Sequence, residues 1–290
     1  MRNNWFIKTG ITILLLMATI PSLHAQYDHS AAEKAGWRLA SQAYTFRSFT
    51  FAETLDKLNE ANIKYVEMYP AQQIGGGIAG TTKYDMDKET RGKIKDLLKQ
   101  KNIQLVDYGV INTSDTAEWR KIFEFAKDMG IETILSEPKP ELLPMIDRLA
   151  NQYGINVALH NHPVPSYYWH PSVVLSALRG RSPRIGAAAD FGHWVRSGLD
   201  PVECVKMLEG KIISTHTKDL NIFGTRAAHD VPWGTGICNL SGILHELKKQ
   251  GFKGVFSVEY EYNWDHSLPE VKESARYFYY ATSWLFKPEK

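Results

Sequence analysis

Carboxylate, imidazole and ammonium side chains recur through the second half of the chain, each group directly after an apolar, β-rich run. The groups are Ser136-Glu137-Pro138, His160-Asn161-His162, Asp190-Phe191-Gly192-His193, His216-Thr217-Lys218-Asp219 and Glu259-Tyr260-Glu261. Such side chains converging on one place would repel one another or stay poorly solvated unless a cation joined them. Mixed oxygen and nitrogen ligation suits Mn, Zn, Co or Mg. Because packing alone does not explain five successive runs with such ends, the residue types predict a site for one divalent metal ion.

Other residues near the run ends are candidates for contact with a substrate. Arg47 follows the first run and Glu67 lies at the end of the second, and for both a surface salt bridge and substrate binding stay open. On the last run we expect Glu259 to point inward and Glu261 to face the opposite way. Trp194 follows the sixth run, where its ring could stack on a sugar. The other tryptophans near these ends are Trp169, Trp233 and Trp264.

The elements that must position these groups alternate along the chain. Short β-rich runs are followed by amphipathic helical stretches, which is typical of repeated βα units around a parallel sheet. The predicted strands are Leu39–Phe46, Lys64–Tyr69, Ile103–Gly109, Ile131–Glu137, Ile155–His160, Arg184–Asp190, Ile212–His216 and Gly254–Glu259, and the clearest helices are Phe51–Ala61, Glu89–Lys101, Ala117–Met129, Leu142–Tyr153 and Leu240–Gln250. The pattern predicts a single α/β domain, a (β/α)8 TIM barrel, whose catalytic groups come from the carboxyl ends of the strands.

A Gly-rich phosphate loop is not found after the first predicted strand, so a nucleotide-binding open sheet is excluded. The segment Gly75-Gly76-Gly77 lies in a long loop from Tyr69 to Asp87 and is interpreted as a flexible lid. The balance of 34 Lys and Arg against 32 Asp and Glu leaves a net charge of +2 without a basic block, which argues against nucleic acid and for a small-molecule partner. Cys204 and Cys238 are expected to stay unpaired, and the sequence leaves a homo-oligomer open.

The first 25 residues have the layout of a secretory signal peptide. Arg2 and Lys8 precede the apolar stretch Ile11–Ile20, which is broken at Pro21 and followed by Leu-His-Ala. About ten apolar residues are too few to cross a bilayer roughly 30 Å thick as a helix. We therefore expect residues 1–25 to be removed, residues 26–290 to form the barrel, and the protein to be secreted across the inner membrane into the periplasm, without a membrane span.

The order of the polar motifs resembles that of one known superfamily. Asp190-x-x-His193, His216-x-Lys218-Asp219, Val231-Pro-Trp-Gly-x-Gly236 and Glu259 are similar to the motifs of the sugar phosphate isomerase/epimerase superfamily, the xylose isomerase-like barrels, over essentially the whole mature chain. The resemblance implies a divalent metal at strands five to eight and proton removal beside a sugar carbonyl. By position, Asp190, His216 and Glu259 match the family's ligands. The fifth-strand position, commonly Glu in the epimerases, is His160.

This departure sets the predicted roles. We predict Glu137, Asp190, His216 and Glu259 as metal ligands, His160 or His162 as the base, and His193 and Lys218 as groups that orient the substrate and stabilise a developing oxyanion. Some members of the superfamily resemble this chain in having a His-Asn-His strand and act as lyases on 3-keto-glycosides.

The sequence therefore predicts a secreted 3-keto-glycoside lyase of carbohydrate metabolism. The first alternative is a sugar isomerase or epimerase acting on an unphosphorylated sugar, and the remote one is a sugar-binding protein without catalysis. The missing basic footprint argues against metal-dependent phosphodiester cleavage, known from another branch of the barrel.

Overall fold

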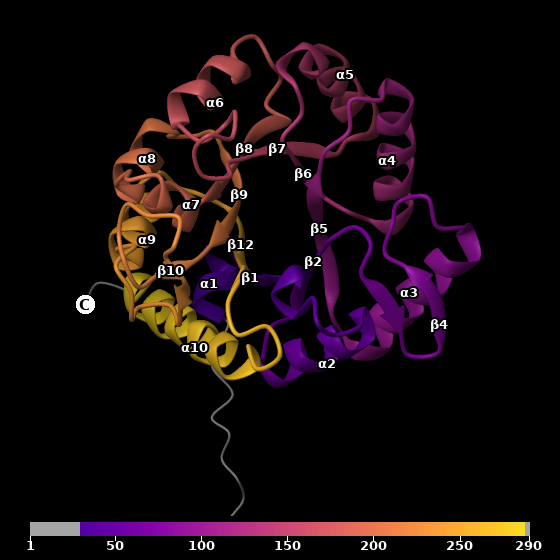
Figure 1. Ribbon diagram of the computed structural model, residues 1–290, viewed down its shortest axis with the longest axis horizontal. Coiled ribbons are helices and arrows are strands. Elements are labelled where there is room, and N and C mark those ends of the chain that lie inside the picture. Colours follow the sequence, from indigo (N-terminus) through magenta and orange to yellow (C-terminus); the bar gives the residue numbers. More distant parts are fainter. Residues whose placement is uncertain (1–29, 288–290) are drawn as a thin grey trace, which may run out of the picture.

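Eight parallel strands close into a barrel in the computed structural model, which describes residues 30–287. Around the barrel the strands follow the order β1, β12, β9, β8, β7, β6, β5 and β2, and β2 pairs with β1 to close it. Helices surround the strands on the outside (Figure 1). The predicted (β/α)8 architecture is confirmed. The predicted signal peptide, residues 1–25, lies outside the described residues.

All eight predicted strands are found in the barrel, with ends that differ by a few residues. Their bounds are β1 (Trp37–Gln42), β2 (Tyr65–Met68), β5 (Gln104–Ile111), β6 (Thr133–Ser136), β7 (Asn156–His160), β8 (Ile185–Asp190), β9 (Ile212–Thr217) and β12 (Gly254–Val258). The strands are almost entirely buried, because a parallel barrel is covered by helices outside and filled by side chains inside.

The helices end where the sequence predicts. Asn102, Gly130 and Gly154 follow their helices with φ of 53°, 74° and 72°, the left-handed conformation that Gly and Asn adopt at low cost. Each of these turns leads the chain directly into the next strand. The helices are α1 (Ser30–Lys34), α2 (Phe51–Glu60), α3 (Lys88–Lys101), α4 (Thr116–Met129), α5 (Leu143–Tyr153), α6 (Pro171–Leu178), α7 (Phe191–Arg196), α8 (Pro201–Met207), α9 (Leu240–Lys249) and α10 (Leu268–Leu285), with 3-10 turns η1 (Ala43–Phe46) and η2 (Pro140–Leu142).

Two small hairpins lie outside the barrel, and neither was predicted. The long glycine-rich loop forms β3 (Gln73–Gly75) and β4 (Ile78–Thr81), and Ile74 in the middle of β3 is fully buried. The side-chain amide of the preceding Gln72 donates to the Phe49 carbonyl and the Thr54 hydroxyl, both at 3.0 Å. This anchoring to α2 contradicts the interpretation of the segment as a simple flexible lid.

The second hairpin joins β10 (Asp219–Leu220) to β11 (Asp230–Val231) beside the seventh barrel strand. The Asp219 carboxylate accepts backbone N–H groups of Gly234, Gly236 and Cys238 at 2.9, 2.9 and 3.0 Å. Asp219 therefore fixes the segment after β11 against the barrel. Its role is structural, and it is not one of the clustered polar side chains described below.

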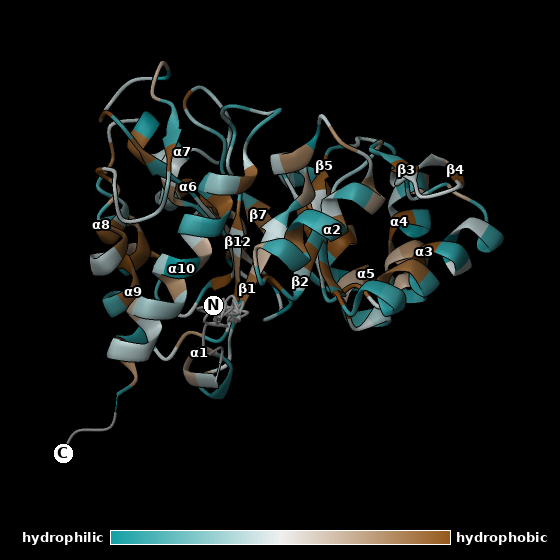
Figure 2. Ribbon diagram, turned by 90° about the horizontal axis from the view of Figure 1, so that it is seen from below, coloured by the Kyte–Doolittle hydropathy of each residue, from teal (hydrophilic) through white to brown (hydrophobic). Residues whose placement is uncertain are grey.

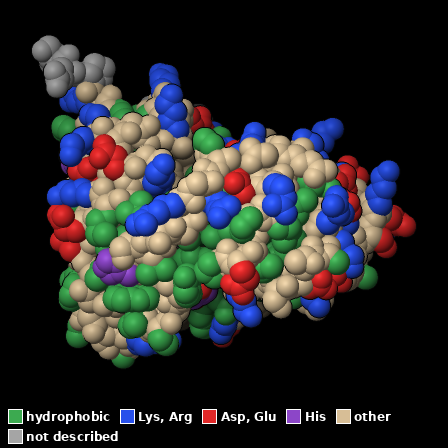
Figure 3. Space-filling view, turned by 90° about the horizontal axis from the view of Figure 1, so that it is seen from above, with side chains coloured by type: hydrophobic (Ala, Val, Ile, Leu, Met, Phe, Trp, Pro, Cys, Tyr) green, Lys and Arg blue, Asp and Glu red, His purple; other side chains and the backbone are tan. Residues whose placement is uncertain are grey.

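The outer surface carries charges of both signs. Figure 2 shows hydrophilic residues on the outward faces of the helices, and Figure 3 shows Lys and Arg interspersed with Asp and Glu on one face. Among the described residues no helix is long and apolar enough to span a membrane. Cys204 and Cys238 are both buried and unpaired, which confirms the expectation for them.

Candidate active site

Four buried side chains meet at the carboxyl ends of neighbouring strands. His160 and Asp190 end β7 and β8, His216 lies near the end of β9, and Glu259 follows β12 directly. Each offers one ligand atom, and these atoms all lie within 4.8 Å of one another. The parallel register, in which Asp190 pairs with His216, brings the strand ends to one edge of the barrel. We call these four residues the ligand cluster.

Two imidazole nitrogens in the ligand cluster are buried without a hydrogen-bond partner. His160 Nε2 lies 3.6 Å from Asp190 Oδ2, and His216 Nδ1 lies 2.9 Å from Glu259 Oε2 without hydrogen-bond geometry. Buried polar atoms are normally paired, so these nitrogens require a partner. A divalent cation bound by two imidazoles and two carboxylates would satisfy both, and this donor set suits Zn, Mn or Co. The residues present therefore fit the metal that the sequence predicts.

The structure places Glu137 beside the ligand cluster and gives the fourth position to His160. Glu137 Oε1 lies 2.9 Å from His160 Nδ1, is bonded to His162 Nδ1 as well, and Oε2 accepts the Ser166 hydroxyl at 2.6 Å. A carboxylate behind a ligating histidine is the usual arrangement that fixes the ring's orientation. Glu137, His160 and His162 also form a second, overlapping group of potential ligands.

Glu67 lies beneath the ligand cluster, inside the barrel. Its carboxylate accepts His216 Nε2 at 2.9 Å, the Gln42 amide at 2.9 Å and the Ser257 hydroxyl at 2.9 Å. The side chain has no exposed surface, so its position fits neither of the two roles left open for it, a surface salt bridge or a substrate contact. By holding His216 Nε2, Glu67 leaves Nδ1 of the same ring directed at the cluster.

We expect Glu67→Gln to weaken divalent metal binding by about 10- to 100-fold, because the carboxylate that holds His216 becomes a neutral amide of similar shape. The measurement is the dissociation constant by competition with a chelator. Ser257→Ala is the matched control, since it removes one hydrogen bond to Glu67 and leaves the carboxylate in place. Equal affinities of Glu67→Gln and the unaltered protein would contradict the orienting role.

Lys218 connects the two carboxylates of the ligand cluster. Its ammonium donates to Asp190 Oδ2 at 2.5 Å and to Glu259, and lies 3.5 Å from Glu261 Oε2. Burial lowers the pKa of Lys218, but the carboxylates outweigh it and hold the pKa above its ordinary value. The expectation that Glu261 faces away from Glu259 is wrong, because residues two apart in an extended chain lie on the same side.

His193 is held in one neutral form. Burial, together with the positive charge of Lys218, holds the pKa of His193 well below its ordinary value despite the Asp190 carboxylate. The Arg196 guanidinium donates to His193 Nδ1 at 3.1 Å, so the ring proton is on Nε2. Asp230 and Glu261 fix Arg196 through contacts of 3.3 Å each. His193 can therefore donate a hydrogen bond near the cluster but is a poor base.

A cleft of about 380 Å³ opens next to the ligand cluster. It is lined by Gln42, Tyr44, Tyr69, Pro70, Gly109, Val110, Asn112, His162, Glu259 and Glu261. The His162 side chain is 47% exposed, and among the described residues its Nε2 has no partner. Of the two histidines predicted as base, His162 therefore faces the cleft, whereas the side chain of His160 is 1% exposed.

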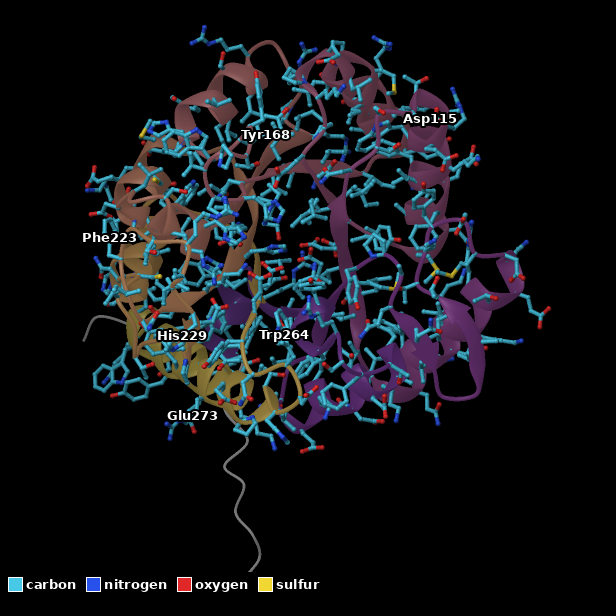
Figure 4. All side chains as sticks on the ribbon, in the orientation of Figure 1. Asp115, Tyr168, Phe223, His229, Trp264 and Glu273 are labelled. Carbon is cyan, nitrogen blue, oxygen red and sulfur yellow. The ribbon has the colours of Figure 1, made fainter. Side chains whose placement is uncertain are left out.

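Trp194 and Arg47 are the other two residues predicted to contact the substrate, and only Arg47 lies beside the cleft. Trp194 is fully buried in the core against Phe191, so the structure does not bring it to the cleft. Arg47 lies beside the cleft, with its guanidinium 3.9 Å from the ring centroid of Trp264 and 5.0 Å from that of Tyr44. In Figure 4 Trp264 lies towards the barrel axis, whereas Phe223 and Glu273 lie at the periphery.

Metal binding is expected to strengthen as pH rises through the titration of the two cluster histidines. Burial lowers the pKa of both His160 and His216, but the neighbouring carboxylates outweigh it and raise each pKa above its ordinary value. A metal must displace these protons, so binding releases protons and weakens in acid. Calorimetric titration with zinc in buffers of different ionisation enthalpy measures the release. A proton count of zero near neutral pH would contradict this arrangement.

Comparison with known proteins gives the same fold. The family model described as a xylose isomerase-like TIM barrel matches residues 55–281. A crystal structure of an uncharacterised protein from Parabacteroides distasonis is 33% identical, with a TM-score of 0.69 and coverage of 84% of this chain and 98% of that one.

Two structures of lower identity are similar in fold. A D-tagatose 3-epimerase-like protein is 18% identical, with a TM-score of 0.69, over 86% of this chain and 98% of its own. An IolI protein with a bound zinc atom is 17% identical, with a TM-score of 0.65, over 87% of this chain and 100% of its own. Among proteins of curated function no match is found.

Proposed function

Since the chain belongs to the family of xylose isomerase-like TIM barrels, we propose that it is a divalent-metal-dependent carbohydrate enzyme, and specifically a 3-keto-glycoside lyase. The observation that carries the proposal is the pair Glu137 and His162 beside the ligand cluster. Glu137 holds His162 Nδ1, so Nε2 of that ring is the atom that faces the cleft. This is the arrangement of an oriented general base next to a site for a polarising cation.

His160, Asp190, His216 and Glu259 would hold the metal. A divalent ion bound there would polarise the sugar carbonyl and make the neighbouring C–H bond more acidic. His162 Nε2 then takes the proton from C2, beside the ketone at C3. The electron pair released at C2 forms the C1=C2 double bond, the bond from C1 to the glycosidic oxygen breaks, and the departing oxygen takes a proton from water.

Other side chains of the site stabilise negative charge as it develops. His193 offers its Nε2–H, and its neutral form is held by Arg196. Lys218 keeps Asp190 and Glu259 together as one anionic pair and balances part of their charge. These groups are prepositioned by buried contacts, so little reorganisation is needed during the reaction.

An isomerase or epimerase acting on an unphosphorylated sugar is the second candidate, favoured by one observation. Glu259 lines the cleft and is a carboxylate that could return a proton from another direction. Burial raises the pKa of Glu259, but His216 and Lys218 outweigh it and hold the pKa well below the ordinary value, which makes Glu259 a weak base. One oriented base on one side of the sugar favours elimination over proton exchange between two faces.

The experiment that tests the proposal is incubation of the purified protein with a 3-keto-glucoside before and after treatment with a chelator. Release of the leaving group with formation of a 1,2-unsaturated 3-keto sugar, abolished by chelation and restored by metal, supports the lyase. Solvent deuterium entering an intact sugar without release would support the isomerase or epimerase instead. Neither reaction in metal-loaded protein would leave the remote sugar-binding alternative.

We also propose that the enzyme acts in the periplasm, after removal of residues 1–25. The support is the signal-like layout of the first 25 residues. N-terminal sequencing of the protein from a periplasmic fraction tests this, and a chain that begins with Met1 in the cytoplasmic fraction would refute it.

A further inference from the structure

The cleft has two chemically different sides. On the side of β7 and β12 it is lined by His162, Glu259 and Glu261, next to the ligand cluster. On the side of β1 and β2 it is lined by Tyr44, which follows β1, and Tyr69, which follows β2. A keto sugar held for proton removal by His162 must lie on the first side. The second side is left for whatever is attached to that sugar.

Two aromatic rings, Tyr44 and Tyr69, line that second side, and a third, Trp264, packs against Tyr44. The Tyr44 ring stands edge-on to Tyr69, with centroids 5.2 Å apart at 87°, and to Trp264, with centroids 5.5 Å apart at 79°. Edge-to-face pairs of this kind are a preferred aromatic geometry. All three side chains are half-buried, so each ring keeps some exposed surface. We call Tyr44, Tyr69 and Trp264 the aromatic wall.

Arg47 packs against the aromatic wall. Its guanidinium lies over the Trp264 ring at 3.9 Å and donates to the Tyr44 hydroxyl. Within residues 30–287 no carboxylate forms an ion pair with Arg47, which is exposed. Its remaining N–H groups are therefore available to oxygen atoms of a bound molecule, and a guanidinium stacked on an aromatic ring keeps its donors in a fixed plane.

We infer that the aromatic wall is the subsite for the leaving group of the glycoside, and that this leaving group is a six-membered ring. This inference rests on the proposed function, since only an elimination has a leaving group. The substrate class is then a 3-keto-glycoside whose C1 oxygen carries a second sugar or an aryl ring. Both kinds of ring present an apolar face to Tyr69, and a second sugar also presents hydroxyl oxygen atoms to Arg47. A methyl glycoside leaves the wall empty.

The first test compares kcat/KM for 3-keto-glucosides that carry methyl, phenyl and glucosyl leaving groups. Because leaving groups differ in intrinsic reactivity, the informative quantity is the ratio of ring-bearing to methyl substrate in each variant. Tyr69→Ala is expected to lower this ratio about fivefold to tenfold, Tyr69→Phe to keep it, and Tyr280→Ala, an exposed residue of α10 remote from the cleft, to keep it. A fall for the glucosyl or the phenyl substrate alone assigns the subsite to that ring.

A second measurement separates failure of this inference from failure of the proposed function. Calorimetry compares binding of an unreactive glucosyl disaccharide, a phenyl glucoside and a methyl glucoside to the metal-loaded protein. Tighter binding of a ring-bearing ligand that is lost in Tyr69→Ala supports the subsite even if no glycoside is cleaved. The inference would be overturned if glycosides are cleaved and the ratio of kcat/KM for ring-bearing to methyl substrate is the same in Tyr69→Ala and in the unaltered protein. Equal binding of all three ligands would also overturn it.

Discussion

Asparagine in place of His162 is expected to lower kcat for leaving-group release by about 100- to 10,000-fold, the usual contribution of a general base. The asparagine amide can still reach Glu137 but cannot take a proton from carbon. Metal content is expected to stay unchanged, because His160 keeps both Glu137 and its place in the ligand cluster. The measurement is kcat together with metal stoichiometry for the same preparation.

His245→Asn is the matched control for this substitution. His245 is an exposed histidine of α9 whose ring nitrogen donates to the Ser241 carbonyl, remote from the cleft. A kcat for His162→Asn within a few-fold of the control would exclude His162 as the base. A loss of activity accompanied by a loss of metal would instead move His162 into the metal site, in the second potential ligand group with Glu137 and His160.

The sequence predicts the barrel well because its signals are local. Each strand is a short apolar run after a turn, and Asn102, Gly130 and Gly154 mark the helix ends by their tolerance of positive φ. The hairpin after β2 could not be predicted in the same way. It depends on Gln72, whose contacts with Phe49 and Thr54 are specified by the tertiary fold and leave no periodic pattern.

The ligand cluster is only partly predictable for a related reason. A motif shows which side chains lie at strand ends, but it does not show which of them reach the metal site. Glu137 follows β6 and His160 ends the neighbouring β7, and the structure directs His160 to the cluster while Glu137 holds its ring from behind. The sequence leaves His160 open as ligand or base, and the burial of its ring favours the role of ligand.

The cleft itself was the least predictable part. Trp194 was chosen because it follows a strand, yet α7 turns its ring into the core. Tyr44 and Tyr69 are not among the predicted site residues, although both lie within two residues of a strand end, as the ligands do. The same rule that finds polar groups at the carboxyl ends of strands could have found these two aromatic residues.

Replacement of Glu259 by glutamine is expected to weaken metal binding by at least about 100-fold, more than any change outside the ligand cluster. The neutral amide keeps the size of the side chain but removes an anionic ligand, and it leaves Lys218 paired with Asp190 and Glu261. Fewer carboxylates then neutralise the Lys218 ammonium, and its positive charge further disfavours binding of the metal cation nearby. The dissociation constant measured by chelator competition, with circular dichroism to confirm folding, provides the result.

Glu261→Gln is the closest control that the chain offers. Glu261 also reaches Lys218, at 3.5 Å, and lines the same cleft, but it lies outside the ligand cluster. It is expected to keep metal affinity within about tenfold, because its carboxylate contacts Arg196 and Lys218, whereas Glu67 is bonded directly to the ligand His216. If both variants bound metal equally well, the ligand cluster would not be the metal site. It would instead be a network of ion pairs, in which the Lys218 ammonium is the cation that neutralises Asp190 and Glu259.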